Sequence, residues 1–189
     1  MSYLYKVYGL YIRSEFKLQE LNEVEEDENI LKPVSVCWGK VPSRFEETLQ
    51  SGRAAWYTKD EVCFHIEGLA TFLILNGNHI LIETVKEFEL QAIKAYLLGS
   101  CMGFLLFQRG SIAIHGGAIM MEDGGVIFTG ERGAGKSTLT STLRKKGYKF
   151  ITDDVAAIRI NEEYLIEPGY PQQKLCEDII EEEDLLKES

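Results

Sequence analysis

The sequence has little cysteine, little histidine and no long hydrophobic run, and these absences argue against several classes of protein. Its four cysteines lie far apart without a C-x-x-C pair, which argues against a zinc site or a disulfide framework and favours buried, reduced thiols. The N-terminus lacks the basic start and apolar core of a signal peptide. The most apolar window, residues 95–107, is too short to span a bilayer. We therefore expect a cytoplasmic protein that does not enter a membrane.

Positive charge is also scarce, because acidic residues outnumber basic ones and the net charge is −10 at pH 7. This balance argues against a general nucleic-acid binder. Acidic side chains gather at 23–28 and 177–189, whereas residues 132–149 hold six basic residues and no acidic one. An acidic protein with one basic stretch suits a phosphorylated small ligand. With 189 residues and 45% apolar content, the chain can build one large domain or two small ones.

The basic stretch begins in a phosphate-binding loop, the pattern G-x-x-x-x-G-K-[ST]. A short apolar strand is predicted over residues 126–129 and leads into the loop. Glycines allow backbone N–H groups to surround a triphosphate, and the following helix directs its positive end at the anion. Lys136 supplies a charge for the β- and γ-phosphates, and Ser137 offers a hydroxyl to Mg²⁺. The expected ATP-binding residues are Gly130, Glu131, Arg132, Gly133, Ala134, Gly135, Lys136, Ser137 and Thr138.

A helix over 137–146 and a strand over 148–152 are expected to follow, with Asp153 and Asp154 at the strand's end. One crossover should make this strand a parallel neighbour of strand 126–129, so that both aspartates emerge beside the phosphate loop. One carboxylate can then bind Mg²⁺ together with Ser137. The other can accept a proton from an attacking hydroxyl. The residues themselves leave open which aspartate has which role.

The first half of the chain predicts a small, mainly antiparallel β unit over residues 1–86. Strands are expected within 3–14, at 34–38 and in four segments between 54 and 85, with a hairpin at 76–78. His65 and His79 lie in these strands without a ligand-spaced partner, so structural roles are favoured. A largely buried helix is expected over 87–108, as part of a connecting segment 87–110. Its predicted inward positions include Phe88, Ala92 and Ala95.

The second half, residues 111–189, predicts an α/β phosphate-loop domain. A strand over 111–121 should form a hairpin with the strand that feeds the loop, through Glu122 and Asp123. His115 would then lie on a strand next to the phosphate-loop strand. Further strands are expected at 155–160 and 164–166, a rigid loop at 168–171 and a helix at 174–187 with a solvated acidic face.

Taken in order, these motifs resemble the HPr serine kinase C-terminal-like family, and most closely its short members, some of which are encoded in lasso-peptide gene clusters. The resemblance covers residues 3 to about 176, and several short runs carry it. They are 8–10, 14–15, 96–100, 108–110, 114–117, 128–130, 133–138, 147–148, 153–154 and 168–171.

The resemblance implies a fold similar to the phosphoenolpyruvate carboxykinase type of P-loop domain. It also implies Mg²⁺-dependent transfer of the ATP γ-phosphate to a serine hydroxyl of a peptide or small protein. Under it, Lys136 and Ser137 serve the phosphates and the metal, Asp153 is the base, Asp154 supports metal or charge, and His115 assists.

Two departures from the family pattern limit what is carried over. HPr kinase has Glu where this chain has Thr138, and no counterpart of its later motif for the reverse reaction is found, so phosphorolysis is not predicted. Relatives usually continue well past residues 168–171. The chain is therefore expected either to be a fragment or to associate with a copy of itself or a partner subunit.

Three function classes remain open at this point. The first is a kinase acting on a peptide or small protein, and the second is a catalytically silent nucleotide-binding protein. The third is a small-molecule kinase, which would use the same loop and the same base.

Overall fold

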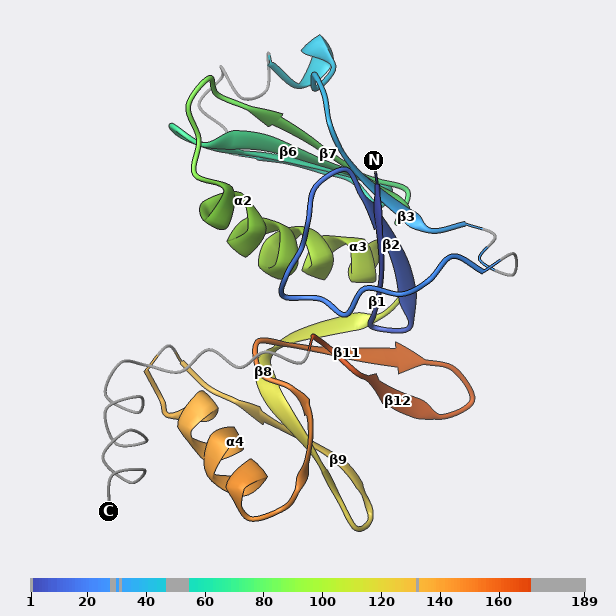
Figure 1. Ribbon diagram of the computed structural model, residues 1–189, viewed down its shortest axis with the longest axis vertical. Helices are drawn as coiled ribbons and strands as arrows, with labels where there is room; N and C mark the ends of the chain where they lie inside the picture. The colour runs from blue at the N-terminus through green and yellow to red at the C-terminus, as the bar shows by residue number, and fades with distance from the viewer. Residues whose placement is uncertain (1, 28–29, 31, 47–54, 132, 171–189) are drawn as a thin grey trace.

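Two β-sheets, a helical segment between them and a further helix on the smaller sheet are the main elements of the computed structural model, which describes residues 2–27, 30, 32–46, 55–131 and 133–170 (Figure 1). The larger sheet comes from the N-terminal half and the smaller one from the C-terminal half. The protein is therefore a mixed α/β structure of the α+β kind. Arg132 and the predicted helix at 174–187, with its acidic run, lie outside the described residues.

The N-terminal sheet has seven strands in the order β1-β2-β3-β7-β6-β5-β4. Most neighbours are antiparallel, as expected, but β2 and β7 both run parallel to β3, so the sheet is mixed. A single-turn 3₁₀ helix, η1 (Ser43–Phe45), follows β3. The strands are β1 (Tyr3–Val7), β2 (Leu10–Ser14), β3 (Val34–Trp38), β4 (Ala55–Tyr57), β5 (Glu61–Ile66), β6 (Ala70–Leu75) and β7 (His79–Thr84).

Two tight turns set the register of this sheet. Tyr8 and Gly9 both have positive φ between β1 and β2, and so do Asn76 and Gly77 between β6 and β7. Two such residues in succession match the right-handed twist of the flanking strands. The predicted hairpin at 76–78 is thereby confirmed, and segment 3–14 is a hairpin of two strands rather than one.

A continuous helix over Leu90–Gln108 crosses the N-terminal sheet (Figure 1). It comprises α2 (Leu90–Tyr96), a π-helical turn η2 (Leu97–Cys101) and α3 (Met102–Gln108). By length and composition it could cross a membrane, but its apolar stripe packs into the core beneath the sheet. The buried apolar side chains are Ile93, Leu97, Leu98, Cys101, Met102, Leu105 and Leu106.

The predicted inward face of this helix was partly wrong. Ala95 is exposed, and Phe88 precedes the helix and is 41% exposed. The core is instead formed by larger aliphatic side chains, such as Ile93 and Leu97, which lie one or two positions from the predicted ones. The π-helical turn changes the residue spacing along the helix and so changes which side chains face the core. Apart from the neighbouring backbone of the helix itself, no atom of the described residues lies within 4 Å of where a Cβ would stand on Gly99 or Gly103, so neither glycine serves a close packing contact.

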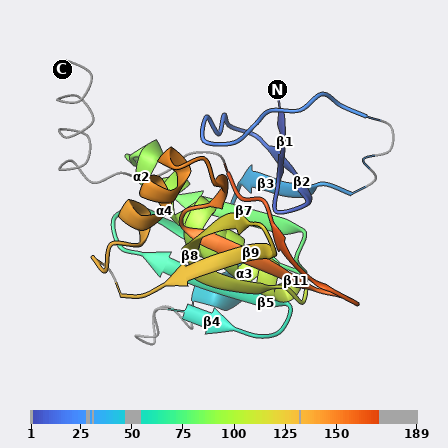
Figure 2. The ribbon, with the colours of Figure 1, turned by 90° about the horizontal axis from the view of Figure 1, so that it is seen from below.

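The C-terminal sheet is built around one long strand, β8 (Ile112–Met121). β9 (Gly124–Thr129) pairs with one edge of β8. β10 (Lys149–Thr152) and β11 (Val155–Ile160) pair one after the other with the opposite edge of β8. β12 (Tyr164–Glu167) completes the sheet against β11. The helix α4 (Lys136–Lys145) packs on β8, β9 and β10, and the view from below shows it next to β8 and β9 (Figure 2).

The expectation that strands 126–129 and 148–152 are parallel neighbours was wrong. β9 and β10 run in the same direction, but β8 lies between them and is antiparallel to both. The reason is the β8–β9 hairpin, which places an extra strand where the crossover would otherwise return. Their C-terminal ends still meet at the same part of β8, because Thr129 lies opposite Gly116 and Thr152 opposite Ala118.

The two sheets share one continuous apolar core. Tyr8, Val155, Ala157 and Tyr170 belong to the same buried cluster as Phe72 and Ile80 of the N-terminal sheet. The division into segments 1–86, 87–110 and 111–189 remains a prediction about domains.

Candidate functional site

The site lies where the long pairing of β10 and β11 along β8 is interrupted. Thr152 is opposite Ala118 and Val155 is opposite His115, so Asp153 and Asp154 face the two intervening glycines of β8. The register between β10 and β8 also shifts just before this point, which is the irregularity of a β-bulge. Bulges turn the side chains of a strand in new directions, and here the interruption places two carboxylates, a buried one on Asp153 and a partly buried one on Asp154, near the end of β9.

Asp154 is held by three contacts. Its Oδ1 lies 3.3 Å from Nδ1 of His115, and its Oδ2 accepts a hydrogen bond from the Tyr170 hydroxyl at 3.3 Å. Its carbonyl oxygen accepts from the N–H of Gly116 at 3.1 Å. The His115 side chain is 65% exposed, whereas that of Asp154 is 19% exposed. The predicted proximity of His115 to the aspartates is thus present in the structure.

Asp153 is buried and faces the phosphate-loop helix. Its Oδ1 lies 3.2 Å from the Thr140 hydroxyl of α4, which is also within hydrogen-bond distance of the carbonyl oxygens of Lys136 and Ser137. A hydroxyl carries one proton, so these acceptors compete for it. The contact fixes the aspartate pair relative to the first turn of α4.

Gly117 makes the close approach of α4 to β8 possible. A Cβ at this position would lie 2.5 Å from Cγ2 of Thr140, inside any normal contact distance. The Gly116-Gly117 pair therefore has a packing role. It lets the helix and the aspartates come together over one strand.

The phosphate loop connects β9 to α4 and has the backbone that its glycines allow. Gly133 and Gly135 adopt φ values of +83° and +82°, which side chains with a Cβ rarely adopt. The Lys136 ammonium donates to the carbonyl oxygens of Gly130 at 2.8 Å and Glu131 at 2.9 Å. These two contacts hold the charge over the loop, where the motif would place phosphate oxygens.

The rest of the predicted binding set lies on the same loop and helix. Gly135 precedes α4, while Ser137 and Thr138 stand in its first turn, where backbone N–H groups have no partner within the helix. Glu131, Gly133, Ala134 and Thr138 are exposed, and Ser137 is half-buried. The described part of the chain holds no group of three or more His, Cys, Asp or Glu side chains that could bind a metal unaided.

Tyr170 and Tyr8 form the wall behind Asp154. Burial, and after it the negative charge of Asp154, raises the pKa of Tyr170 well above its ordinary value, so Tyr170 remains a hydrogen-bond donor. Burial likewise raises the pKa of Tyr8. The Tyr8 hydroxyl is buried, and no group of the described residues meets it in hydrogen-bond geometry. The Thr152 hydroxyl, which lies near it, donates to the carbonyl oxygen of Val155.

Sequence reasoning missed Thr140 and Tyr170 as members of the site. Thr140 stands one helical turn after Lys136, so the helix period would have placed it on the same face. Tyr170 lies in the predicted rigid loop at 168–171, and only its contact with Asp154 reveals a role. His65 contacts Thr71, and His79 contacts Ser35 and Cys37, so both belong to the N-terminal sheet and not to this site.

No family model matches this chain, and no curated protein or solved structure matches it.

Proposed function

We propose that this protein transfers the γ-phosphoryl group of ATP to a serine hydroxyl of a peptide or small protein, on a P-loop domain of the phosphoenolpyruvate carboxykinase and HPr kinase type. The observation that carries the proposal is one juxtaposition. The helix that begins in the phosphate loop is bonded through Thr140 to Asp153, with Asp154 and His115 directly beside it.

Each group has a chemical task in such a transfer. Backbone N–H groups of residues 130–138 and the Lys136 ammonium would hold the phosphates, replacing the carbonyl contacts that Lys136 makes now. Mg²⁺ would neutralise developing charge on the phosphates. Mg²⁺ typically takes only one or two protein ligands beside phosphate oxygens, and Ser137 and Asp154 would provide them.

The acceptor hydroxyl is a poor nucleophile at neutral pH and depends on being placed in line with the γ-phosphorus. As its oxygen bonds to phosphorus, the bond from phosphorus to the β,γ-bridging oxygen breaks and ADP leaves. The hydroxyl proton passes to a carboxylate, which we assign to Asp153. His115 and Tyr170 position Asp154 beside it. The choice of serine over a metabolite hydroxyl rests on the family resemblance.

The test is incubation with γ-labelled ATP and Mg²⁺, offering peptide pairs that differ only in Ser or Ala. Label is expected on the serine peptide alone. Equal label on both peptides, or label on a small metabolite instead, would favour the alternative that the protein is a small-molecule kinase. ATP binding without any transfer would favour the alternative that the protein binds nucleotide but is catalytically silent.

Three substitutions assign the roles within the site. Lys136→Ala is expected to weaken ATP binding about ten- to a hundredfold in calorimetry, because it removes a charge-assisted contact worth about 1.5–3 kcal/mol. Lys146→Ala, just past the other end of α4, is the control. Asp153→Asn is expected to abolish transfer and keep ATP binding, whereas Asp154→Asn shifts the Mg²⁺ dependence. Full turnover by Asp153→Asn would show either that Asp154 is the base and Asp153 supports the metal, or that both aspartates have only structural roles.

A further inference from the structure

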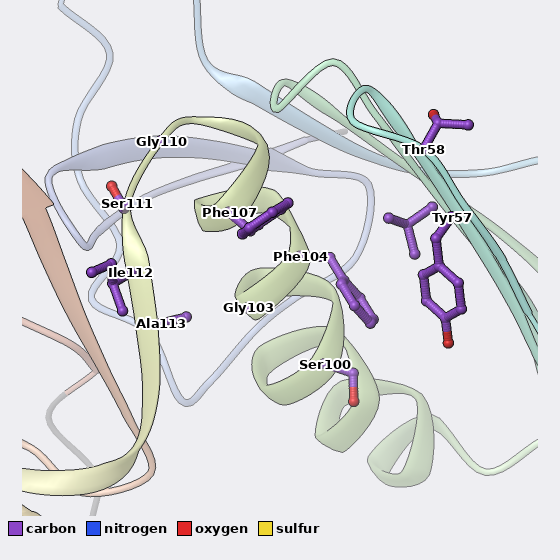
Figure 3. Close-up of a pocket in the computed structure, with 11 residues that line it drawn as sticks. Tyr57, Thr58, Ser100, Gly103, Phe104, Phe107, Gly110, Ser111, Ile112 and Ala113 are labelled. Carbon is purple, nitrogen blue, oxygen red and sulfur yellow. The ribbon is translucent and has the colours of Figure 1, made fainter.

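A groove of about 680 Å³ opens between the N-terminal sheet and the start of β8 (Figure 3). Phe104 and Phe107 of α3 and Tyr57 of β4 line one side of it, and the chain from Gly110 to Ala113 forms the opposite wall. Phe107 is 66% exposed and Tyr57 is 64% exposed. Such a concentration of exposed aromatic surface is a feature of binding sites.

Gly103 hollows the groove on the helix side. It lines the groove, and beyond the backbone of its own helix no described atom lies within 4 Å of where its Cβ would stand. Gly99, one turn earlier on the same helix, is equally open but is not among the residues that line the groove. The open space beside Gly103 therefore belongs to the groove.

The wall at Ala113 is an unpaired strand edge. The N–H of Gly116 points to the β11 side of β8, where it bonds the carbonyl oxygen of Asp154. Backbone groups alternate along a strand, so those of Ala113 and His115 point to the opposite side. β9 pairs with that side only as far as Gly116, and no other strand of the described residues continues it. In Figure 3 the groove opens on this side of β8, away from the orange strand β11.

We propose that an extended segment of a peptide adds to this edge as a strand, in line with β9, and lays alternate side chains into the groove. The acceptor role of that peptide rests on the proposed function. A strand that continues the line of β9 ends next to Gly130, where β9 gives way to the phosphate loop. A serine at that end of the segment would stand beside His115, Asp154 and the loop.

The edge itself specifies the chemistry of the occupant. Unpaired N–H and C=O groups at a strand spacing are complementary to a peptide backbone, which pairs with them irrespective of its sequence. Pockets beside the edge then select alternate side chains, and here the lining selects aromatic or aliphatic ones. A small apolar molecule would use the groove but not the edge, so backbone substitutions distinguish the two occupants.

The experiment selects binders from a library of short randomised peptides, each with one fixed serine, on the full chain, and measures their affinity by fluorescence anisotropy. Gly103→Leu fills the groove and is expected to weaken the selected peptides at least about tenfold, whereas Gly99→Leu leaves them unchanged. Ala113→Pro removes the N–H that faces the incoming strand but none that pairs with β11, and it is expected to weaken binding about tenfold. Unfolding transitions and ATP affinity of all three variants confirm that they are folded.

An N-methyl scan of the best peptide provides the second measurement. Methylation is expected to abolish binding at alternate residues only, because every second N–H would face β8. Loss at no position or at all positions overturns strand addition, and so does a library without binders that respond to Gly103→Leu. Peptides that bind in this pattern but receive no phosphate would leave the docking site standing and overturn the proposed function.

Discussion

At the scale of single residues, the packing of α4 onto β8 depends on one missing methyl group. Gly117→Ala would bring a Cβ to 2.5 Å from Cγ2 of Thr140, so the helix must shift. We expect a loss of about 1–3 kcal/mol in the free energy of unfolding, measured by denaturant titration. Thr140→Ser removes the opposing methyl and keeps the hydroxyl, so adding it to Gly117→Ala should restore part of the loss. A double variant no more stable than Gly117→Ala would show that the contact is not the cause.

Tyr8 and Tyr170 predict a dependence of stability on alkaline pH. Burial raises the pKa of both above the ordinary value of 10.0, so above that pH the unfolded chain loses protons that the folded chain retains. The tyrosines' contribution is fully present below pH 10 and declines above it, by up to about 1.36 kcal/mol per pH unit for each one.

Tyr8→Phe should make this decline shallower, as seen by unfolding at a series of pH values. At neutral pH it should cost little or be mildly stabilising, because the Tyr8 hydroxyl has no partner in hydrogen-bond geometry among the described residues. Tyr164→Phe, at a tyrosine that is 78% exposed on β12, is the control for the substitution itself. An unaltered slope in Tyr8→Phe would contradict the burial argument.

At the scale of elements, the helix over Leu90–Gln108 has one buried face and one exposed face. Ile93 is fully buried against the N-terminal sheet, whereas Ala95 is exposed. Ile93→Asp should therefore destabilise the fold by about 3 kcal/mol or more, because it buries an unpaired carboxylate. Ala95→Asp should be nearly neutral. Thermal melts of the two variants check this, and equal damage by both would indicate that the helix is surrounded by apolar material on all sides.

Elements with strong local signals were predicted from the sequence. β3 was predicted to the residue, and α4 and β12 to within about one residue, because capping glycines and turn residues mark their ends. Pairing between strands was not predictable in the same way. The insertion of β8 between β9 and β10 depends on which edge of β8 each strand meets, and no local signal specifies an edge.

At the scale of the whole molecule, the shared core predicts coupling between the two sheets. Both tryptophans, Trp38 and Trp56, lie in the N-terminal sheet, whereas the proposed ATP site lies in the C-terminal one. Mg·ATP at a hundred times its dissociation constant should stabilise the folded state by about 2.7 kcal/mol. If the sheets unfold together, tryptophan fluorescence should report this entire shift. A tryptophan transition indifferent to Mg·ATP would instead support independent domains.

The sequence by itself determined the parts whose cause is local. The phosphate loop, its helix, the β8–β9 hairpin and the aspartate pair follow from glycine conformation, helix capping and turn chemistry acting over a few residues. Only the tertiary structure decided what meets the aspartates. Thr140 reaches Asp153 because Gly117 admits the helix, and Tyr170 reaches Asp154 across the shared core. The open edge at Ala113 is likewise a consequence of where β9 stops pairing with β8. Such contacts join residues far apart in the chain, so they depend on strand order and packing, which no short stretch of sequence encodes.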